Sequence, residues 1–285
     1  MRLAAGPTSS GTTRVLGVIA ALLLAATALF GLVLSPGDVN QSDAVRLLYL
    51  HVPTATFFYV AFGLTAVGSV LWLWKRSVWW DLVAAASAEI GVLFTGITLV
   101  VGALWGRTTW GTYWDWDPRL TTTALAFLIY LGYLVVRRLP AEPATRNTRA
   151  AIVGIVGALD LPLIHFSVDW WRSLHQRATV STFDVKLEGL MLFTLFLALV
   201  AFGVLFTWLL IHRFRGLWLE DEAEASALDV AIAERRAEAV EVRHASERSE
   251  RANVSVDAEG MATRSGASLR SSESIGAGPT KEGRH

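Results

Sequence analysis

The chain has 285 residues, of which 53% are hydrophobic and only 18% are charged. This balance is too apolar for an ordinary soluble domain and indicates a membrane protein. The formal net charge of +0 leaves no overall positive field that would attract nucleic acid. Because the chain has no cysteine, disulfides, zinc–thiolate sites and iron–sulfur clusters are excluded within it.

Six apolar runs are long enough to cross a bilayer, whose hydrocarbon core requires about 20 residues of helix. They cover residues 15–34, 47–74, 82–105, 120–136, 150–168 and 187–211. The first run resembles a signal peptide because Arg2 and Arg14 precede it, but its apolar residues continue to Ser35-Pro36-Gly37, which favours a retained span. We therefore predict an all-α, polytopic membrane bundle of six transmembrane helices over residues 15–215.

The charges at the ends of these runs predict the orientation, since loops rich in Lys and Arg are usually cytoplasmic. One set of loops carries Arg14, Lys75, Arg76, Arg137, Arg138, Arg146, Arg149, Arg213 and Arg215. The opposite loops carry Arg46, Arg107, Arg119, Arg172, Arg177 and Lys186. We expect a multi-pass protein of a bacterial plasma (inner) membrane, with residues 1–14 and the C-terminus both cytoplasmic. The outward cations either face an anionic ligand or are solvated charges at the rim.

The outer end of the second run carries a histidine beside a proline. His51 precedes Val52-Pro53, and a proline near the start of a helix fixes the backbone without removing a needed hydrogen bond. We expect the imidazole of His51 to project from a rigid first turn. The alternative is a hydrogen-bonded histidine at the membrane surface.

The loop 106–119, between the third and fourth runs, is the most unusual segment. It reads GRTTWGTYWDWDPR and combines tryptophans with glycines, carboxylates and arginines. A belt of interfacial aromatic residues explains one or two such rings, but not this combination. If the segment forms a short interfacial helix, Trp110 and Trp114 lie on one face and Trp116 starts the return to the membrane. Such a shelf of rings suits a flat ligand such as a porphyrin; simple anchoring is the alternative.

The third outer loop, residues 168–186, follows the fifth run and contains a second group of aromatic residues. Trp170 and Trp171 precede His175 there. If this loop is helical, Trp171 and His175 share one face. His165 falls inside the fifth run, where we expect its ring to bond a neighbouring backbone carbonyl; ligation of a cofactor is the alternative.

The composition changes after the sixth run. Residues 220–251 mix acidic and basic side chains, and the remainder is rich in Ser, Gly and Arg. We expect residues 216–285 to form a cytoplasmic tail whose first half is an exposed helix and whose second half is disordered.

The outer loops together predict a haem site. Two neutral imidazoles are a natural axial pair for haem iron, and His51 and His175 are expected to approach the Trp-rich loop from opposite sides. Guanidinium groups pair bidentately with carboxylates such as the haem propionates. The candidates are Arg119, Arg172 and Arg177. Asp117 either orients these groups or caps the helix that begins at Pro118.

These residues also carry a family resemblance. The segment 110–117, WGTYWDWD, resembles the WGxxWxWD signature (WWD domain) of the tryptophan-rich haem-handling membrane proteins of cytochrome c-type biogenesis. Within that family, the six spans, the LHVP segment at 50–53 and the DWWRSLHQ segment at 169–176 are similar to the haem exporter protein C branch of system I. The resemblance covers residues 14–214.

The resemblance implies that haem b is a transient cargo, held between His51 and His175. It also implies that haem lies over Trp110, Trp114 and Trp116 and is passed to a haem chaperone alongside ABC-transporter subunits. The segment Asp117-Pro118-Arg119 is also similar to the system II branch, so a system II-type cytochrome c synthase component is an alternative.

Other classes of protein fit the sequence less well. A di-haem cytochrome b needs histidines paired across spans within the bilayer, and no run carries two. No nucleophile–base pair, phosphate loop or zinc motif is present, so we do not expect an enzyme. A structural subunit of an ABC-type transporter, with no haem of its own and aromatic loops that dock partner proteins, is a further alternative.

Overall fold

The computed structural model describes residues 10–175, 187 and 189–273, with residues 249–273 described by their backbone alone. The chain divides into two compact units, Met1–Glu220 and Asp221–His285. The described residues are helical apart from loops and one isolated β-bridge, between Asp38 and Ser42. The predicted all-α class is therefore confirmed.

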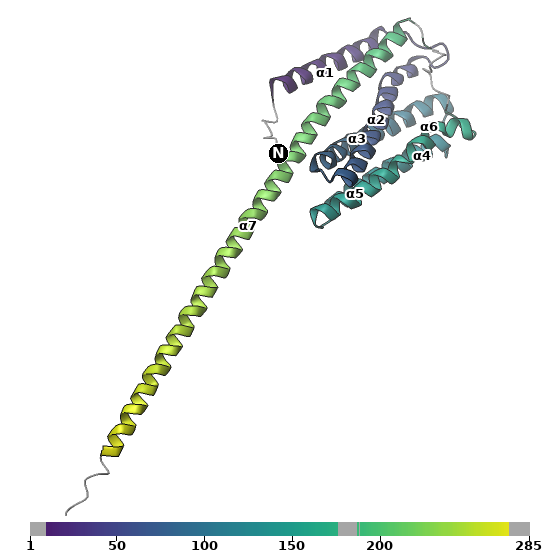
Figure 1. Cartoon of the computed structure of the whole chain (residues 1–285). Coiled ribbons are helices and arrows are strands. Elements are labelled where there is room, and N and C mark those ends of the chain that lie inside the picture. Colours follow the sequence, from purple (N-terminus) through teal and green to yellow (C-terminus); the bar gives the residue numbers. More distant parts are fainter. Residues whose placement is uncertain (1–9, 176–186, 188, 274–285) are drawn as a thin grey trace, which may run out of the picture. The chain divides into compact units, whose positions relative to one another are not determined.

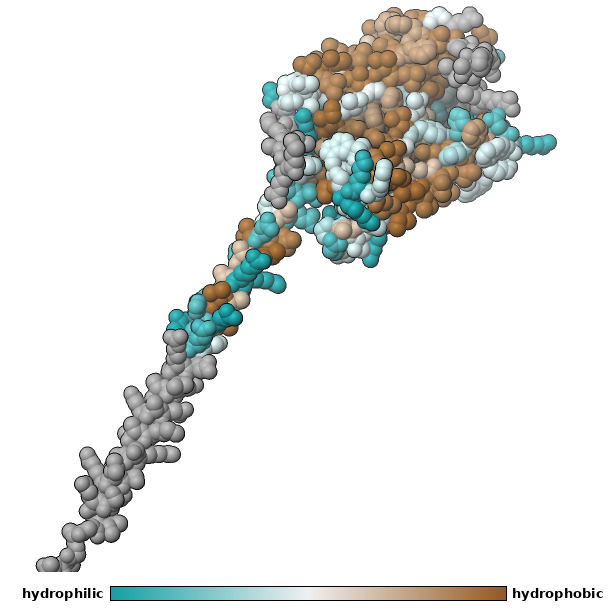
Figure 2. All heavy atoms as spheres, viewed as in Figure 1, coloured by the Kyte–Doolittle hydropathy of each residue, from teal (hydrophilic) through white to brown (hydrophobic). Residues whose placement is uncertain are grey.

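Six helical segments are long and apolar enough to cross a membrane, as predicted. They are Gly11–Leu34, Asp43–Lys75, Val78–Trp110, Pro118–Arg138, Pro143–Trp170 and Gly189–Arg248. Figure 2 shows apolar residues over most of the visible face of the first unit, as expected for a surface in contact with lipid tails. A helix suits this environment because it satisfies its own backbone hydrogen bonds.

Figure 1 labels the α-helices along the chain. In chain order they are α1 Gly11–Leu29, the π-helical turn η1 Phe30–Leu34, the 3₁₀ turn η2 Asp43–Leu47, α2 Leu48–Lys75, α3 Val78–Trp110, α4 Pro118–Arg138, α5 Pro143–Ala158, α6 Asp160–Trp170 and α7 Gly189–Glu273.

The fifth span is divided between α5 and α6, which the continuous apolar run does not reveal. Only Leu159 separates the two helices. Pro162 lies in the first turn of α6, and a proline has no N–H to donate to the carbonyl four residues earlier. The carbonyl of Ala158 therefore lacks its helical donor, and the span bends at this point.

Helices α2 and α3 pack closely together in the first unit, α5 packs on α2, and α4 packs on α3, α5 and α6. The rings of Phe62 on α2 and Tyr130 on α4 stack with their centroids 3.6 Å apart. Hydroxyl groups join α2 to α3 within the apolar core, as between Thr65 and Ser87 at 3.0 Å. Small and hydroxyl-bearing residues allow such close approach between membrane helices.

Two ion pairs bind neighbouring helices where the charged loops begin. Arg137 on α4 donates two hydrogen bonds to Asp81 on α3, at 2.7 and 2.8 Å. Arg213 on α7 pairs with Glu89 on α3. Asp81 directly precedes the third apolar run and Glu89 lies inside it, and each has its counter-ion on a helix distant in sequence.

The second unit consists, in its described part, of α7 residues up to Glu273. Its side chains from residue 222 to residue 248 are exposed. The helix extends further into the Ser- and Gly-containing segment than the composition predicts, in keeping with the many Ala, Glu and Arg residues that precede it.

Candidate functional site

His51 lies in the first part of α2, and its ring is held by contacts with α3. The His51 and Trp105 ring centroids are 5.7 Å apart, with the planes nearly perpendicular. The imidazole also packs on Gly102, where an added Cβ would lie 2.9 Å from His51 Cε1. The Nδ1 atom of His51 is buried and has no hydrogen-bond partner; the backbone of Thr98 approaches the ring without completing a bond to Nδ1.

Pro53 occupies a different place from the one expected. The η2 turn precedes α2, so Pro53 lies inside the helix, where it is buried, rather than in its first turn. The position of His51 is therefore held by the packing of α2 on α3, and not by a proline in the first turn of the helix.

Trp105 is a site residue that the sequence did not single out. Its indole Nε1 donates a hydrogen bond to Oε1 of Gln41, at 2.9 Å, in the first outer loop. This bond fixes the ring that contacts His51. The residue stands at the end of an apolar run, so its sequence position is that of an ordinary interfacial tryptophan.

The Trp-rich loop does not form the helix that would align Trp110 with Trp114. Helix α3 ends at Trp110, because Gly111 adopts a φ of 82°, which is open mainly to glycine. Residues 111–117 are irregular. Trp114 instead meets Trp116 edge to face, with centroids 5.9 Å apart, and Trp116 is 79% exposed.

His175 lies beyond the end of α6, which stops at Trp170, so the segment from Trp171 to His175 is not helical. The His175 ring packs against Trp110, with centroids 5.0 Å apart. Its Nδ1 atom is buried without a hydrogen-bond partner, 3.9 Å from Oδ1 of Asp117. Burial, aided by the charge of Arg119, lowers the pKa of His175 to about 4. The imidazole is therefore neutral at neutral pH, the form that binds a metal.

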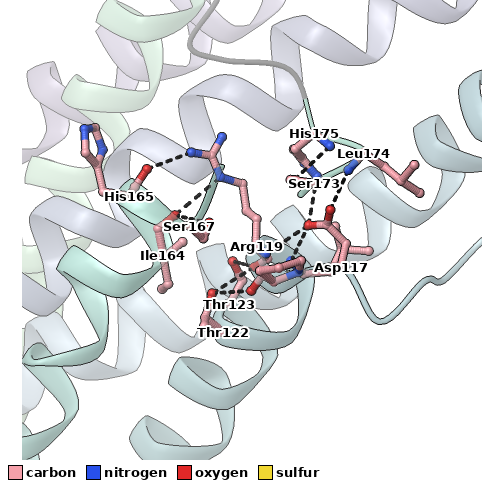
Figure 3. A network of polar contacts seen from close by, with 12 residues as sticks. Asp117, Arg119, Thr122, Thr123, Ile164, His165, Ser167, Ser173, Leu174 and His175 are labelled. Carbon is pink, nitrogen blue, oxygen red and sulfur yellow. Dashed lines mark hydrogen bonds and ion pairs between the residues drawn. The ribbon is translucent and has the colours of Figure 1, made fainter. Parts of the chain in front are cut away.

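Asp117 joins the Trp-rich loop to the third outer loop (Figure 3). It caps α4, since Oδ1 accepts hydrogen bonds from the amides of Arg119 and Leu120, at 2.9 and 3.4 Å. Its Oδ2 accepts a third bond, at 2.6 Å, from the amide of Leu174. Burial raises the pKa of Asp117, but hydrogen bonds from Ser173 and from these amides outweigh it, and the net pKa is lowered. The carboxylate is thus a helix cap and also the anchor of the loop that carries His175.

Arg119 is half-buried and directed toward the middle of α6 (Figure 3). Its Nη2 donates to the carbonyl of His165 at 3.0 Å, and its Nε donates to that of Ile164 at 3.4 Å. The His165 ring is exposed and lies edge-on to Tyr59 and Phe166. Within the described part of the chain this ring makes no hydrogen bond, so the bond expected from it to a backbone carbonyl is not formed.

The remaining predicted cations are placed at the surface or fall outside the described residues. Arg172 is exposed and lines a shallow pocket together with Asp115 and Trp116. Arg177 and Lys186 lie outside the described residues.

The side chains gathered here are of the types that bind haem in proteins. His51 and His175 come from distant parts of the chain, and the ring of each contacts a tryptophan. Two neutral imidazoles suit the axial positions of a haem iron. Among the described residues, no cluster of three or more His, Cys, Asp or Glu side chains could hold a bare metal ion. The fold and the site define a polytopic helical membrane protein with a paired-imidazole, tryptophan-lined surface.

Comparison with known proteins agrees with this class. The family model described as heme exporter protein C matches residues 6–229. The chain is 40% identical over 198 residues to heme exporter protein C of Bradyrhizobium diazoefficiens, covering 68% of this chain and 75% of that protein. It is 36% identical over 207 residues to heme exporter protein C of Haemophilus influenzae, covering 71% and 83%.

A plant relative extends this range. A putative cytochrome c biosynthesis ccmC-like mitochondrial protein of Arabidopsis thaliana is 38% identical over 213 residues, which are 72% of this chain and 80% of that protein. The chain belongs to the heme exporter protein C family, as its tryptophan-rich signature predicts. Membership places it among the membrane proteins that handle haem in cytochrome c maturation.

Proposed function

We propose that this protein binds haem b as a cargo at the outer face of a bacterial inner membrane and delivers it to a haem chaperone during cytochrome c maturation. The observation that supports this most directly is the pair of histidines, His51 and His175, each with a buried Nδ1 that has no partner and each packed against a tryptophan. A buried polar atom without a partner is costly unless a ligand or a rearrangement completes its environment.

In this proposal the two imidazoles ligate the iron and the tryptophans cover the porphyrin. Trp110 stands beside His175, while Trp114 and Trp116 offer exposed rings in the adjoining loop. Bound haem supplies no bond-breaking chemistry here, and the protein is a carrier rather than an enzyme. Neutral, exchangeable ligands favour such a role, because the chaperone must displace them to take the haem.

The propionates are assigned to the outer arginines. These are Arg119, Arg172 and Arg177. Arg119 uses Nε and Nη2 on the carbonyls of α6, which leaves its Nη1 for a propionate oxygen. Asp117 contributes indirectly, by holding the loop that carries His175. We assign both termini to the cytoplasm on the basis of the Lys and Arg distribution, with membrane lipid and ABC-transporter subunits as the neighbours of the apolar surface.

Visible absorption spectra of the detergent-purified protein, oxidised and reduced, test this assignment. We expect a low-spin bis-imidazole spectrum in the wild type that is lost or converted to high spin in His51→Ala and in His175→Ala. His165→Ala and His212→Ala are matched controls, since both remove a histidine outside the proposed ligand pair, and their spectra should keep the wild-type bands.

A protein that binds no haem, or that keeps its spectrum in both ligand variants, would contradict the proposal. It would favour the structural subunit without its own haem. Membership of the heme exporter protein C family favours the carrier role over a system II-type synthase component.

A further inference from the structure

Asp160 is a buried carboxyl group inside the fifth span, at the break between α5 and α6. Its residue is only 4% exposed. Both carboxyl oxygens, Oδ1 and Oδ2, are buried and have no hydrogen-bond partner. It is the first residue of α6, and Pro162 two positions later leaves the carbonyl of Ala158 without its helical donor.

The groups around Asp160 do not neutralise it. On α4, the backbone N–H of Ala126 approaches the carboxyl but does not reach hydrogen-bond geometry. Tyr130, also on α4, directs its hydroxyl to the carbonyl of Gly154 at 3.1 Å. Tyr59 on α2 is the other titratable neighbour. Arg119, the cation at the outer end of α4, is committed to the carbonyls of α6.

The other buried aspartates of the first unit show what a charged state requires. Asp81 is 3% exposed and receives two hydrogen bonds from Arg137. Asp117 is 5% exposed and accepts three backbone hydrogen bonds. Asp160 alone among these three has neither a cation nor a hydrogen-bond donor. An isolated carboxylate without compensation is strongly disfavoured in a membrane interior.

We propose that Asp160 is a proton-binding site within the membrane, and that it carries the proton as a neutral carboxylic acid. A protonated carboxyl group carries its own O–H donor, so it needs no cation or N–H donor to be stable in these surroundings. A bare cation fits less well, since Asp160 belongs to no group of three or more His, Cys, Asp or Glu side chains that could hold a metal ion among the described residues.

The site acts on the helix that leads to the candidate haem site. About one turn along α6 lies the carbonyl of Ile164, one of the two that hold Arg119. Release of the proton would place a charge at the start of this helix and draw water into the break.

Infrared spectroscopy of the full-length protein in detergent tests the proposal without any need for haem. A protonated carboxyl group gives a C=O stretching band that ionised carboxylates lack, and this band shifts in heavy water. We expect such a band at neutral pH in the wild type and its loss in Asp160→Asn, whose amide has nearly the same shape. Asp81→Asn is the matched control, since Asp81 is paired with Arg137 and should contribute no such band.

Labelling with dicyclohexylcarbodiimide, which reacts with protonated carboxyls in apolar surroundings, separates a proton from a metal cation. We expect several-fold more labelling at Asp160 than at Asp81, by peptide mass spectrometry, and no protection by sodium or potassium ions. A band that is absent from the wild type or retained in Asp160→Asn overturns the proposal, as does protection by either ion. A band lost in Asp160→Asn without labelling supports a proton closed off from the reagent.

Discussion

Among single residues, the side chains that pack against His51 and His175 position these two rings more than charged groups do. His51 is positioned by Trp105 and by the absence of a side chain at Gly102, and His175 is positioned by Trp110. Both rings keep a buried Nδ1 with no partner in the described part of the chain. The orientation of each imidazole is therefore sensitive to small changes in the volume beside it.

Gly102→Ala should disturb the His51 ligand. The new Cβ would lie 2.9 Å from Cε1 and 3.4 Å from Nδ1 of His51, and the imidazole must move because α3 cannot. We expect a several-fold loss of low-spin haem, measured by absorption after reconstitution with haem. Gly96→Ala on the same helix is the control, because its nearest neighbour, an atom of Phe127, is at an ordinary 3.4 Å. Equal spectra for the two variants would refute this view of Gly102.

Among the helices, the start of α4 is joined to α6 and to the segment that follows it by two side chains. Asp117 caps α4 and accepts a hydrogen bond from the amide of Leu174, and Arg119, the second residue of α4, donates to two carbonyls in the middle of α6. The loop with His175 is thereby attached to the loop with the tryptophans. Neither connection is local in sequence.

Asp117→Ala should cost about 1–3 kcal/mol of stability, since it removes a helix cap and leaves the Leu174 amide without its acceptor. Because the pKa of Asp117 is lowered in the folded protein, this contribution is complete above the ordinary aspartate pKa and is lost as the pH falls through the folded value. Thermal unfolding in detergent at neutral and at acidic pH measures both effects.

The control for Asp117 is another helix cap. Glu142 caps α5 through the amide of Thr145 and is exposed, away from the haem-site loops. Glu142→Ala should leave haem binding intact, whereas Asp117→Ala should also weaken it by freeing the loop of His175. Intact haem binding in Asp117→Ala would show that the hydrogen bond from Leu174 to Asp117 is not needed to position His175.

At the scale of the whole membrane unit, α3 and α4 are joined at both ends. The Trp-rich loop connects the end of α3 to the start of α4, and the opposite ends of the two helices are linked by the pair of Asp81 and Arg137. Buried ion pairs contribute little beyond what apolar packing gives, but a single buried charge left behind is costly. Loss of either Asp81 or Arg137 alone should therefore lower the stability more than loss of both residues together.

Arg137→Met should destabilise the protein by about 3–5 kcal/mol, because it leaves the Asp81 carboxylate buried and unpaired. The double variant Asp81→Leu with Arg137→Met should recover much of this loss. Chemical unfolding in detergent compares them, with Arg138→Met as the control on an exposed neighbour. A double variant no more stable than Arg137→Met would contradict the argument.

Features that depend on local composition could be predicted from the amino-acid sequence. A stretch of about 20 apolar residues must be helical in a bilayer, so the six spans could be predicted without any tertiary information. The density of Trp, Gly and Asp in residues 106–119 likewise marked the loop, and the scarcity of histidine marked His51 and His175 as candidates.

The contacts that the histidines and tryptophans make with one another could not be predicted from the sequence. The end of α3 at Gly111 breaks the spacing of Trp110 and Trp114, and the tie from Gln41 to Trp105 crosses from a loop to a helix far along the chain. The isolation of Asp160 is equally invisible in sequence, where it resembles the well-paired Asp81. The physical reason is that hydrogen bonds and ring contacts between spans depend on how the helices pack against one another, and a hydrophobic pattern fixes the length and type of each helix without fixing that packing.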